Sequence, residues 1–147
     1  MKKVFSKSVR HTRAFAKELA NKLEPHKKQA VIIGLQGHLG AGKTTFIKAF
    51  ARAFGYKGRV TSPTFLILRS FRLPKSAVFG KLIHIDAYRV DAAELKQLGF
   101  TDIIKNPKNI LVVEWADRVK KIMPRGTAWI KIEHGEKQHE RIIHHRR

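Results

Sequence analysis

The sequence feature that most constrains the fold is a glycine-rich stretch, GHLGAGKTT, at residues 37–45. It follows the apolar run AVIIGL, residues 30–35, which is typical of a strand buried on both faces of a parallel sheet. It leads into residues 43–54, where four apolar side chains fall on one helical face: Phe46, Ile47, Phe50 and Phe54. A strand, a glycine-rich turn and a helix in this order predict an α/β layered domain.

The stretch matches the pattern G-x-x-x-x-G-K-[ST] from Gly37 to Thr44, in the strand-to-helix context that the pattern requires. Glycine admits backbone conformations that a Cβ excludes, so successive N–H groups can point into one anion-binding concavity. The helix that begins near Lys43 adds unpaired N–H groups and the positive end of its dipole. We therefore predict a loop that binds the phosphates of ATP, with main-chain contributions from Leu39, Gly40, Ala41, Gly42 and Lys43.

The side chains that close the loop extend this prediction. Lys43 would reach the β- and γ-phosphates, and the Thr44 hydroxyl would ligate Mg²⁺. Thr45 has two interpretations, since its hydroxyl can contact the α-phosphate or satisfy a backbone group at the helix start.

Two acidic residues stand at the ends of apolar segments. Glu114 follows ILVV, and Asp86 follows LIHI. The carboxyl ends of parallel strands lie beside such a loop, so both acids are candidates for metal binding and for positioning an attacking water. The alternative is a simple ion pair with an arginine such as Arg89 or Arg118. His84 shares the sheet face of Asp86 and is interpreted as a core histidine rather than as a partner of that acid.

The remaining segments complete a single domain, residues 1–147. We predict a short edge strand at 3–6, a helix at 8–23 capped by Ser8 with Val9 on its apolar face, β segments at 64–73 and 78–85, a helix at 91–98 capped by Asp91, a strand at 110–113, a helix at 116–123, and a hairpin of 129–133 with 141–144. The predicted fold is a single P-loop NTPase-like domain with a central, mostly parallel sheet flanked by helices and a C-terminal antiparallel hairpin.

Composition narrows the class of protein. The 147 residues include 31 Lys and Arg against 11 Asp and Glu, a net charge of +20, which either attracts phosphate-rich partners such as tRNA or is a general basic shift. The chain has no cysteine, which excludes disulfides and thiolate metal sites. No apolar run is long enough for a membrane span and no signal peptide is evident, so we expect a cytoplasmic protein.

The nucleotide is expected to be ATP. A guanine-specific protein carries N-K-x-D, whereas this chain has Asn106-Pro-Lys-Asn109 and no D-x-x-G segment. Two other classes remain open: a small-molecule P-loop kinase, which normally needs an Arg-rich lid, and a nucleotide-binding scaffold that does not hydrolyse ATP.

Several stretches together resemble the TsaE family, whose older name is YjeE. They are LGAGKTT at 39–45, SPTF at 62–65, HIDAYR at 84–89, ELKQLGF at 94–100 and VEWADR at 113–118. They occur in the family's order and spacing and cover most of the chain. The resemblance implies a Mg²⁺-dependent ATPase of the bacterial tRNA threonylcarbamoyladenosine (t6A) machinery, slow alone and stimulated by the synthase proteins TsaD with TsaB.

The resemblance also implies roles for individual residues. Lys43, Asp86 and Glu114 match catalytic positions, and Thr44 and Glu114 match the magnesium ligands. Four positions match residues beside the nucleotide or in a mobile segment near it: Val9, Ser62, Thr64 and Trp115. Ser62, Trp115, Tyr88 and Arg89 also have purely structural interpretations. The chain departs from the family at His38, where an acid is usual, which puts a role of that acid in partner contact or hydrolysis in doubt.

Overall fold

A computed structural model describes residues 1–63 and 65–146. Its strands are β1 (Lys2–Ser6), β2 (Val31–Gln36), β3 (Leu68–Arg72), β4 (Lys81–Asp86), β5 (Asn109–Glu114), β6 (Ala128–His134) and β7 (Arg141–Arg146). Its helices are α1 (Val9–Asn21), α2 (Lys43–Ala53), α3 (Ala92–Gln97), α4 (Phe100–Ile104) and the 3₁₀ helix η1 (Ala116–Ile122). Among the described residues, no helix has the length and apolar character needed to cross a membrane.

Within the described part of the chain, the strands form one seven-stranded sheet in the order β1-β7-β6-β2-β5-β4-β3. The pairs β6–β2, β2–β5 and β5–β4 are parallel, and the pairs β1–β7, β7–β6 and β4–β3 are antiparallel. The prediction of a mostly parallel sheet is therefore wrong in its proportions. The sheet is parallel at its centre only, because the β3–β4 and β6–β7 connections and the N-terminal strand β1 add antiparallel pairs at the two edges.

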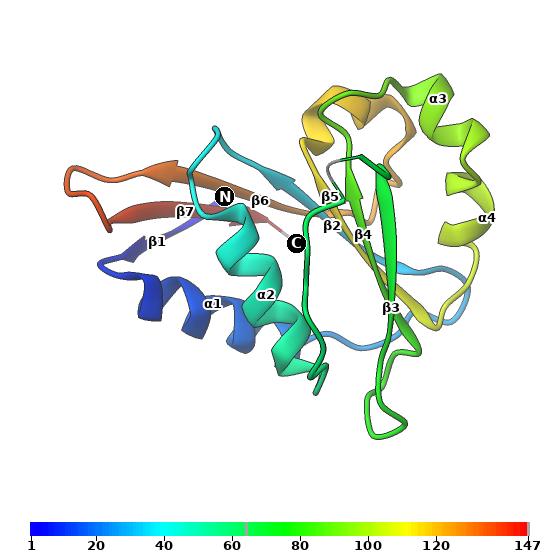
Figure 1. The fold of residues 1–147 in the computed structure, drawn as a ribbon, viewed down its shortest axis with the longest axis horizontal. Coiled ribbons are helices and arrows are strands. Elements are labelled where there is room, and N and C mark those ends of the chain that lie inside the picture. The colour runs from blue at the N-terminus through cyan, green and yellow to red at the C-terminus, as the bar shows by residue number, and fades with distance from the viewer. Residues whose placement is uncertain (64, 147) are drawn as a thin grey trace.

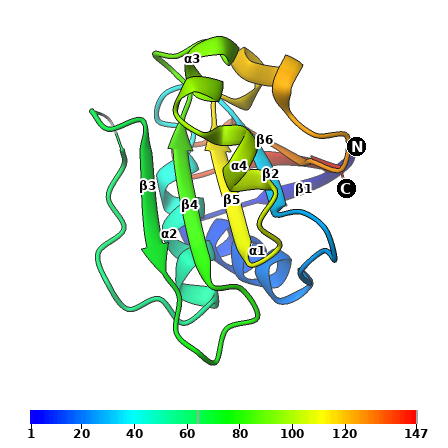
Figure 2. The ribbon, with the colours of Figure 1, turned by 90° about the vertical axis from the view of Figure 1, so that its right-hand side faces the viewer.

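Helices cover both faces of this sheet (Figures 1 and 2). Helices α1 and α2 lie against one face, where their buried side chains join a core cluster that includes Phe46, Phe50 and Ile33. Helices α3, α4 and η1 lie against the other face, over a second cluster that includes Leu95, Phe100 and Val113. The central strand β2 is buried on both sides, as its apolar run predicts.

Local signals place several helix ends correctly. The Ser8 side chain accepts a hydrogen bond from the backbone N–H of His11 at the start of α1. Asp91 and Glu94 form a reciprocal capping box at the start of α3. The C-terminal hairpin also forms as predicted, from β6 and β7.

Other local predictions are wrong. The β segment expected at 64–73 begins only at Leu68, because the backbone N–H groups of Leu66 and Ile67 turn back to the Pro63 carbonyl and Ile67 has a φ of 62°. Helix α4 was not predicted, since five residues are too few for a helical period and Gly99 separates it from α3. Val9 was expected on the apolar face of α1 but is 41% exposed.

Candidate functional site

The glycine-rich stretch forms a loop between β2 and α2 that only glycine accommodates at its bends. Gly37, Gly40 and Gly42 have φ values of 150°, 75° and 102°. A Cβ on Gly37 would lie 2.5 Å from the Ile132 carbonyl oxygen of β6, so the loop also needs the space that glycine leaves. The N–H groups of the first turn of α2 have no side-chain cap, since Gly42 precedes the helix.

A side chain from the other end of the chain holds this loop from outside. Arg141, the first residue of β7, donates from Nε to the Ala41 carbonyl at 2.7 Å and from Nη2 to the Gly40 carbonyl at 3.3 Å. Its Nη1 donates to the carbonyls of Gln138 and Glu140 in the β6–β7 turn. Arg141 therefore ties the hairpin to the loop. It also engages two carbonyl oxygens that would otherwise repel a bound anion.

Lys43 lies inside the loop. Its side chain is only 6% exposed, and its Nζ donates to the Gly37 and His38 carbonyls at 2.7 and 3.0 Å. The ammonium also stands 4.2 Å from the centre of the Trp115 ring. Burial lowers the pKa of Lys43, while the negative charges of Glu114 and Asp86 oppose that shift. The lysine thus sits between the loop and both acids.

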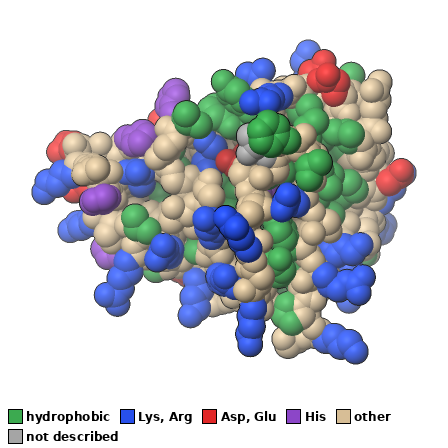
Figure 3. All heavy atoms as spheres, in the orientation of Figure 1, with side chains coloured by type: hydrophobic (Ala, Val, Ile, Leu, Met, Phe, Trp, Pro, Cys, Tyr) green, Lys and Arg blue, Asp and Glu red, His purple; other side chains and the backbone are tan. Residues whose placement is uncertain are grey.

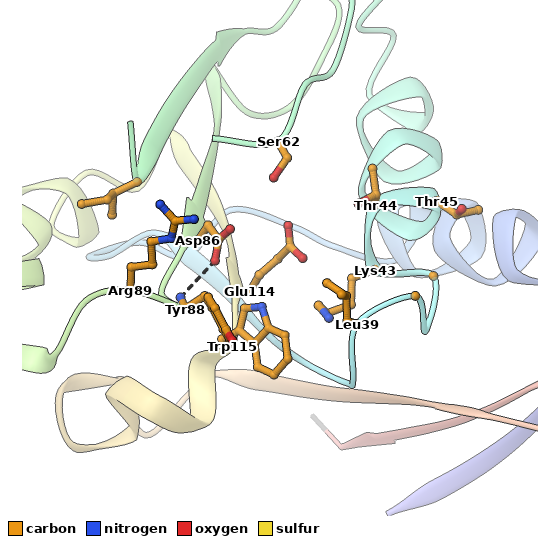
Figure 4. Close-up of a pocket in the computed structure, with 13 residues that line it drawn as sticks. Leu39, Lys43, Thr44, Thr45, Ser62, Asp86, Tyr88, Arg89, Glu114 and Trp115 are labelled. Carbon is orange, nitrogen blue, oxygen red and sulfur yellow. Dashed lines mark hydrogen bonds between the residues drawn. The ribbon is translucent and has the colours of Figure 1, made fainter. Parts of the chain in front are cut away.

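The two acids are neighbours at the tips of paired strands, since Asp86 of β4 is in register with Glu114 of β5. Figure 4 shows both carboxylates turned toward the space between the sheet and the start of α2. Asp86 accepts a hydrogen bond from the Tyr88 backbone N–H at 3.0 Å, which fixes its orientation. The prediction that the two strand ends meet beside the loop is confirmed in its geometry.

Glu114 has a partner that the sequence did not reveal. Its Oε1 lies 2.7 Å from Nε2 of His84, and both residues are buried. An Nε2–H donates in this pair, while Nδ1 of His84 has no hydrogen-bond partner among the described residues. His84 was expected to be a core histidine; it is buried, and it orients the other acid. In the part of the chain that the structure describes, neither acid forms the alternative ion pair with Arg89 or Arg118.

Aromatic side chains close one wall of the site. The Tyr88 and Trp115 rings lie 4.9 Å apart, and Trp115 adopts a left-handed backbone conformation with φ of 55°. A tryptophan in this region costs about 1–2 kcal/mol, so the surrounding packing maintains it. The indole ring contacts the Lys43 ammonium and also packs against the second core cluster, so Trp115 has both a functional and a structural contact.

These features enclose a pocket of about 550 Å³. Its walls come from the loop, the start of α2, the tips of β4 and β5 and the segment before β3 (Figure 4). The lining residues are Leu39, Gly40, Gly42, Lys43, Thr44, Thr45, Ser62, Ile67, Asp86, Tyr88, Arg89, Glu114 and Trp115.

Most of the predicted site residues therefore come together, with three exceptions. Ala41 is fully buried and does not line the pocket, since its N–H donates to the His38 carbonyl and its carbonyl accepts from Arg141. Val9 does not line the pocket. It nevertheless lies near the same end of the sheet, since the preceding Ser6 of β1 pairs with Arg141 of β7. Thr64 lies outside the described residues.

Two further contributors were missed, Ile67 in the wall and Arg141 behind the loop. No local pattern marks either residue. A left-handed isoleucine and an arginine from a distant hairpin reach the site only through tertiary structure.

The oxygen atoms at the site suit a hard cation. The Thr44 hydroxyl and the carboxylates of Glu114 and Asp86 line the pocket, and Mg²⁺ typically takes one or two carboxylates together with phosphates and water. The described residues include no cluster of three or more His, Cys, Asp or Glu, so a self-contained transition-metal cage is not formed among them.

Comparisons with known proteins agree on one family. The model of the family described as "Threonylcarbamoyl adenosine biosynthesis protein TsaE" matches residues 6–143. The chain is 40% identical over 122 residues to the tRNA threonylcarbamoyladenosine biosynthesis protein TsaE of Aquifex aeolicus, covering 82% of this chain and 80% of that protein. It is 34% identical over 120 residues to the protein of the same name from Bacillus subtilis, covering 80% and 70%.

A solved structure shows the same architecture. The crystal structure of Bacillus subtilis YdiB superposes with a TM-score of 0.76 at 29% sequence identity, covering 97% of this chain and 82% of that chain. The overall fold described above is therefore shared with a solved structure.

Proposed function

Since this chain belongs to the TsaE family of threonylcarbamoyl adenosine biosynthesis proteins, we propose that it binds ATP with Mg²⁺ in the pocket and hydrolyses the ATP to support turnover of the t6A synthase. The family places the chain in tRNA t6A biosynthesis, and the pocket supports the finer assignment. The observation that carries the proposal is the convergence of a glycine loop, a buried lysine and two strand-tip acids on one cavity.

The loop supplies the phosphate site. Arg141 engages the carbonyls of Gly40 and Ala41 from outside, so these two carbonyls do not compete for the phosphate-facing side. The N–H groups of the first turn of α2 and of the loop, apart from that of Ala41, which donates to the His38 carbonyl, would bind phosphate oxygens. Lys43 then exchanges its bonds to the Gly37 and His38 carbonyls for the stronger, charge-assisted bonds to phosphate.

The acids and the metal supply the remaining electrostatics. Bound Mg²⁺ would neutralise charge on the β- and γ-phosphates. Thr44 and the free oxygen of Glu114 would hold the ion, since His84 engages the other oxygen and fixes the carboxylate plane. Asp86, oriented by the Tyr88 N–H, would position the attacking water by accepting its hydrogen bond.

We expect slow ATP turnover by the isolated protein, because no contact holds the Arg89 side chain in one position within the described part of the chain. Arg89 lines the pocket but is exposed, and among the described residues it makes no hydrogen bond or ion pair. A cation that is not held in place contributes little preorganised stabilisation of transition-state charge. We propose that TsaD with TsaB, docked at the pocket, accelerates hydrolysis either by fixing such a cation or by supplying one.

Calorimetric titration with ATP and Mg²⁺ tests the loop assignment. Lys43→Ala should weaken binding by roughly 10- to 100-fold, because it removes charge-assisted hydrogen bonds. Lys48→Ala, on the outer face of the same helix, is the matched control and should bind as wild type does. Equal affinity of Lys43→Ala and wild type would exclude the assigned loop.

Release of inorganic phosphate tests the reaction. Phosphate should appear from ATP without any added acceptor, whereas a strict requirement for a small acceptor would favour the kinase alternative. Glu114→Gln should abolish the release that TsaD and TsaB stimulate, while Glu133→Gln, an acid on β6 outside the pocket, should leave it unchanged. Identical rates for Glu114→Gln and wild type would favour the non-hydrolysing scaffold. In a reconstituted modification assay, the wild-type protein should raise the number of synthase turnovers.

A further inference from the structure

The two faces of the sheet carry very different charge. Residues 7–59, which include α1 and α2, contain 12 Lys and Arg against 2 Asp and Glu. Residues 86–122, which include α3, α4 and η1, contain 7 Lys and Arg against 6 Asp and Glu. Counted on the helices alone, α1 and α2 carry six Lys and Arg against one Glu, whereas α3, α4 and η1 on the opposite face carry four against three Asp and Glu, so the two faces differ in charge.

The cations of the first surface project away from the sheet. Arg10, Arg13 and Lys17 recur at helical spacing and are exposed along one flank of the buried stripe of α1, which consists of Thr12, Ala16 and Ala20. On α2, Lys48 and Arg52 are exposed at i and i+4. The two helices pack side by side, with the Phe15 and Phe46 rings 6.2 Å apart, so their outer sides form one surface, here called the α1–α2 face.

Most of this positive charge is not neutralised within the molecule. Within the described part of the chain, Arg10, Arg13, Lys17 and Lys48 have no carboxylate within ion-pair distance. Figure 3 shows Lys and Arg side chains spread over the area of α1 and α2, whereas most of the visible Asp and Glu lie near the outline of the molecule. Like charges placed this closely destabilise the folded chain unless a polyanion binds them.

We infer that the α1–α2 face binds the phosphate backbone of RNA, with tRNA as the physiological partner. A phosphate backbone requires only cations in register along a surface. A protein partner or a membrane requires apolar anchors as well. Among the described residues, Val9 is the single large hydrophobic side chain exposed on the two helices, and it lies at the very start of α1.

The inference rests on the proposed function only for its choice of tRNA among polyanions. The face is separate from the pocket, because none of Arg10, Arg13, Lys17 and Lys48 lines it. Helix α2 nevertheless joins the two, since its first residue is Lys43 in the pocket and its outer side carries Lys48. RNA bound on this face would therefore be held next to the nucleotide site without entering it.

The test is the binding of fluorescently labelled, unmodified tRNA transcript, measured by anisotropy between 50 and 200 mM salt, concentrations over which phosphate contacts weaken steeply (~10³-fold or more for many contacts). The variant Arg13→Glu/Lys17→Glu/Lys48→Glu should bind at least ~10-fold more weakly at low salt, with a log–log salt slope smaller by about 2–3. The control Lys96→Glu/Lys120→Glu/Lys121→Glu, in α3 and η1 on the opposite face, changes the net charge equally, from +20 by six units to +14, and should stay within about twofold of wild type.

The outcomes separate the alternatives. Equal loss in both triple variants would mean that the overall field, not this face, attracts RNA, and would overturn the inference. Binding to vesicles of anionic lipid but not to tRNA would overturn it as well. Comparable binding of a duplex RNA of unrelated sequence would support it, because backbone contacts do not read bases.

ATP titration of the same variants separates this inference from the proposed function. The α1–α2 triple variant should retain wild-type ATP affinity and a cooperative thermal unfolding transition. Loss of ATP binding in Lys43→Ala with tRNA binding intact is expected if both ideas hold. Absence of tRNA binding by wild type with ATP binding intact would remove only the RNA inference.

Discussion

The buried pair of His84 and Glu114 gives a sharp energetic prediction. Glu114 is 5% exposed, and its side chain has one hydrogen-bond partner among the described residues, the imidazole 2.7 Å away. His84→Leu would leave the buried Glu114 carboxylate without its hydrogen-bond partner, at a cost of about 3 kcal/mol. It would also remove the unpartnered Nδ1, which recovers about 1 kcal/mol. The net loss of unfolding free energy is thus about 2 kcal/mol, or about 4–8 °C in Tm for a chain of this size.

A double-mutant cycle isolates the interaction from these side effects. Urea unfolding of H84L, E114L and H84L/E114L should show two destabilised single variants and a double variant close to wild type, because replacing both partners by apolar groups is nearly neutral. His139→Leu, at an exposed histidine, should change stability by less than about 0.5 kcal/mol. A double variant destabilised by the full sum of the two single variants would refute a direct interaction.

Three further predictions follow from the same structure. Arg141→Met should lower the unfolding free energy by about 1–2 kcal/mol and weaken ATP binding, since the loop loses its clamp; unchanged values in both calorimetric assays would contradict that role. Gly37→Ala should cost more than about 2 kcal/mol in chemical unfolding, because its Cβ would meet the Ile132 carbonyl at 2.5 Å. Burial, and after it the charge of Lys2, lowers the pKa of His145 below 6.5. The unfolded chain therefore binds a proton at this residue more readily than the folded chain, so stability should fall as the pH drops below 6.5. Urea midpoints measured across this pH range should fall less in His145→Leu than in wild type.

Local sequence was sufficient for the elements whose causes are local. The caps at Ser8 and Asp91 and the loop from Gly37 to Thr44 follow from side chains and backbone freedom within a few residues. The strand preceding Glu114 was predicted from an apolar run, and parallel pairing then brought this acid beside Asp86 as expected. In each case the competing interactions are short in range, so a pattern of neighbours decides the result.

Predictions failed where distant segments compete. The segment before Leu68 has β-type residues, yet the turn at Pro63 and the left-handed Ile67 keep it out of the sheet. The parallel proportion of the sheet was overestimated because apolar strands do not reveal which edge receives a hairpin. Val9 has an apolar side chain at the right helical phase, but the helix end lies beyond the core that would cover it.

The sequence by itself determined that a glycine loop leads into a helix and that two strands end in acids, because those properties depend on chain stiffness, capping and apolar patterning nearby. Only the tertiary structure decided which groups complete the site. His84 reaches Glu114 across 30 positions, and Arg141 reaches Ala41 across 100. Such contacts exist because the packed sheet brings strand ends together after the loop-closure entropy has been overcome, and no local pattern encodes that geometry.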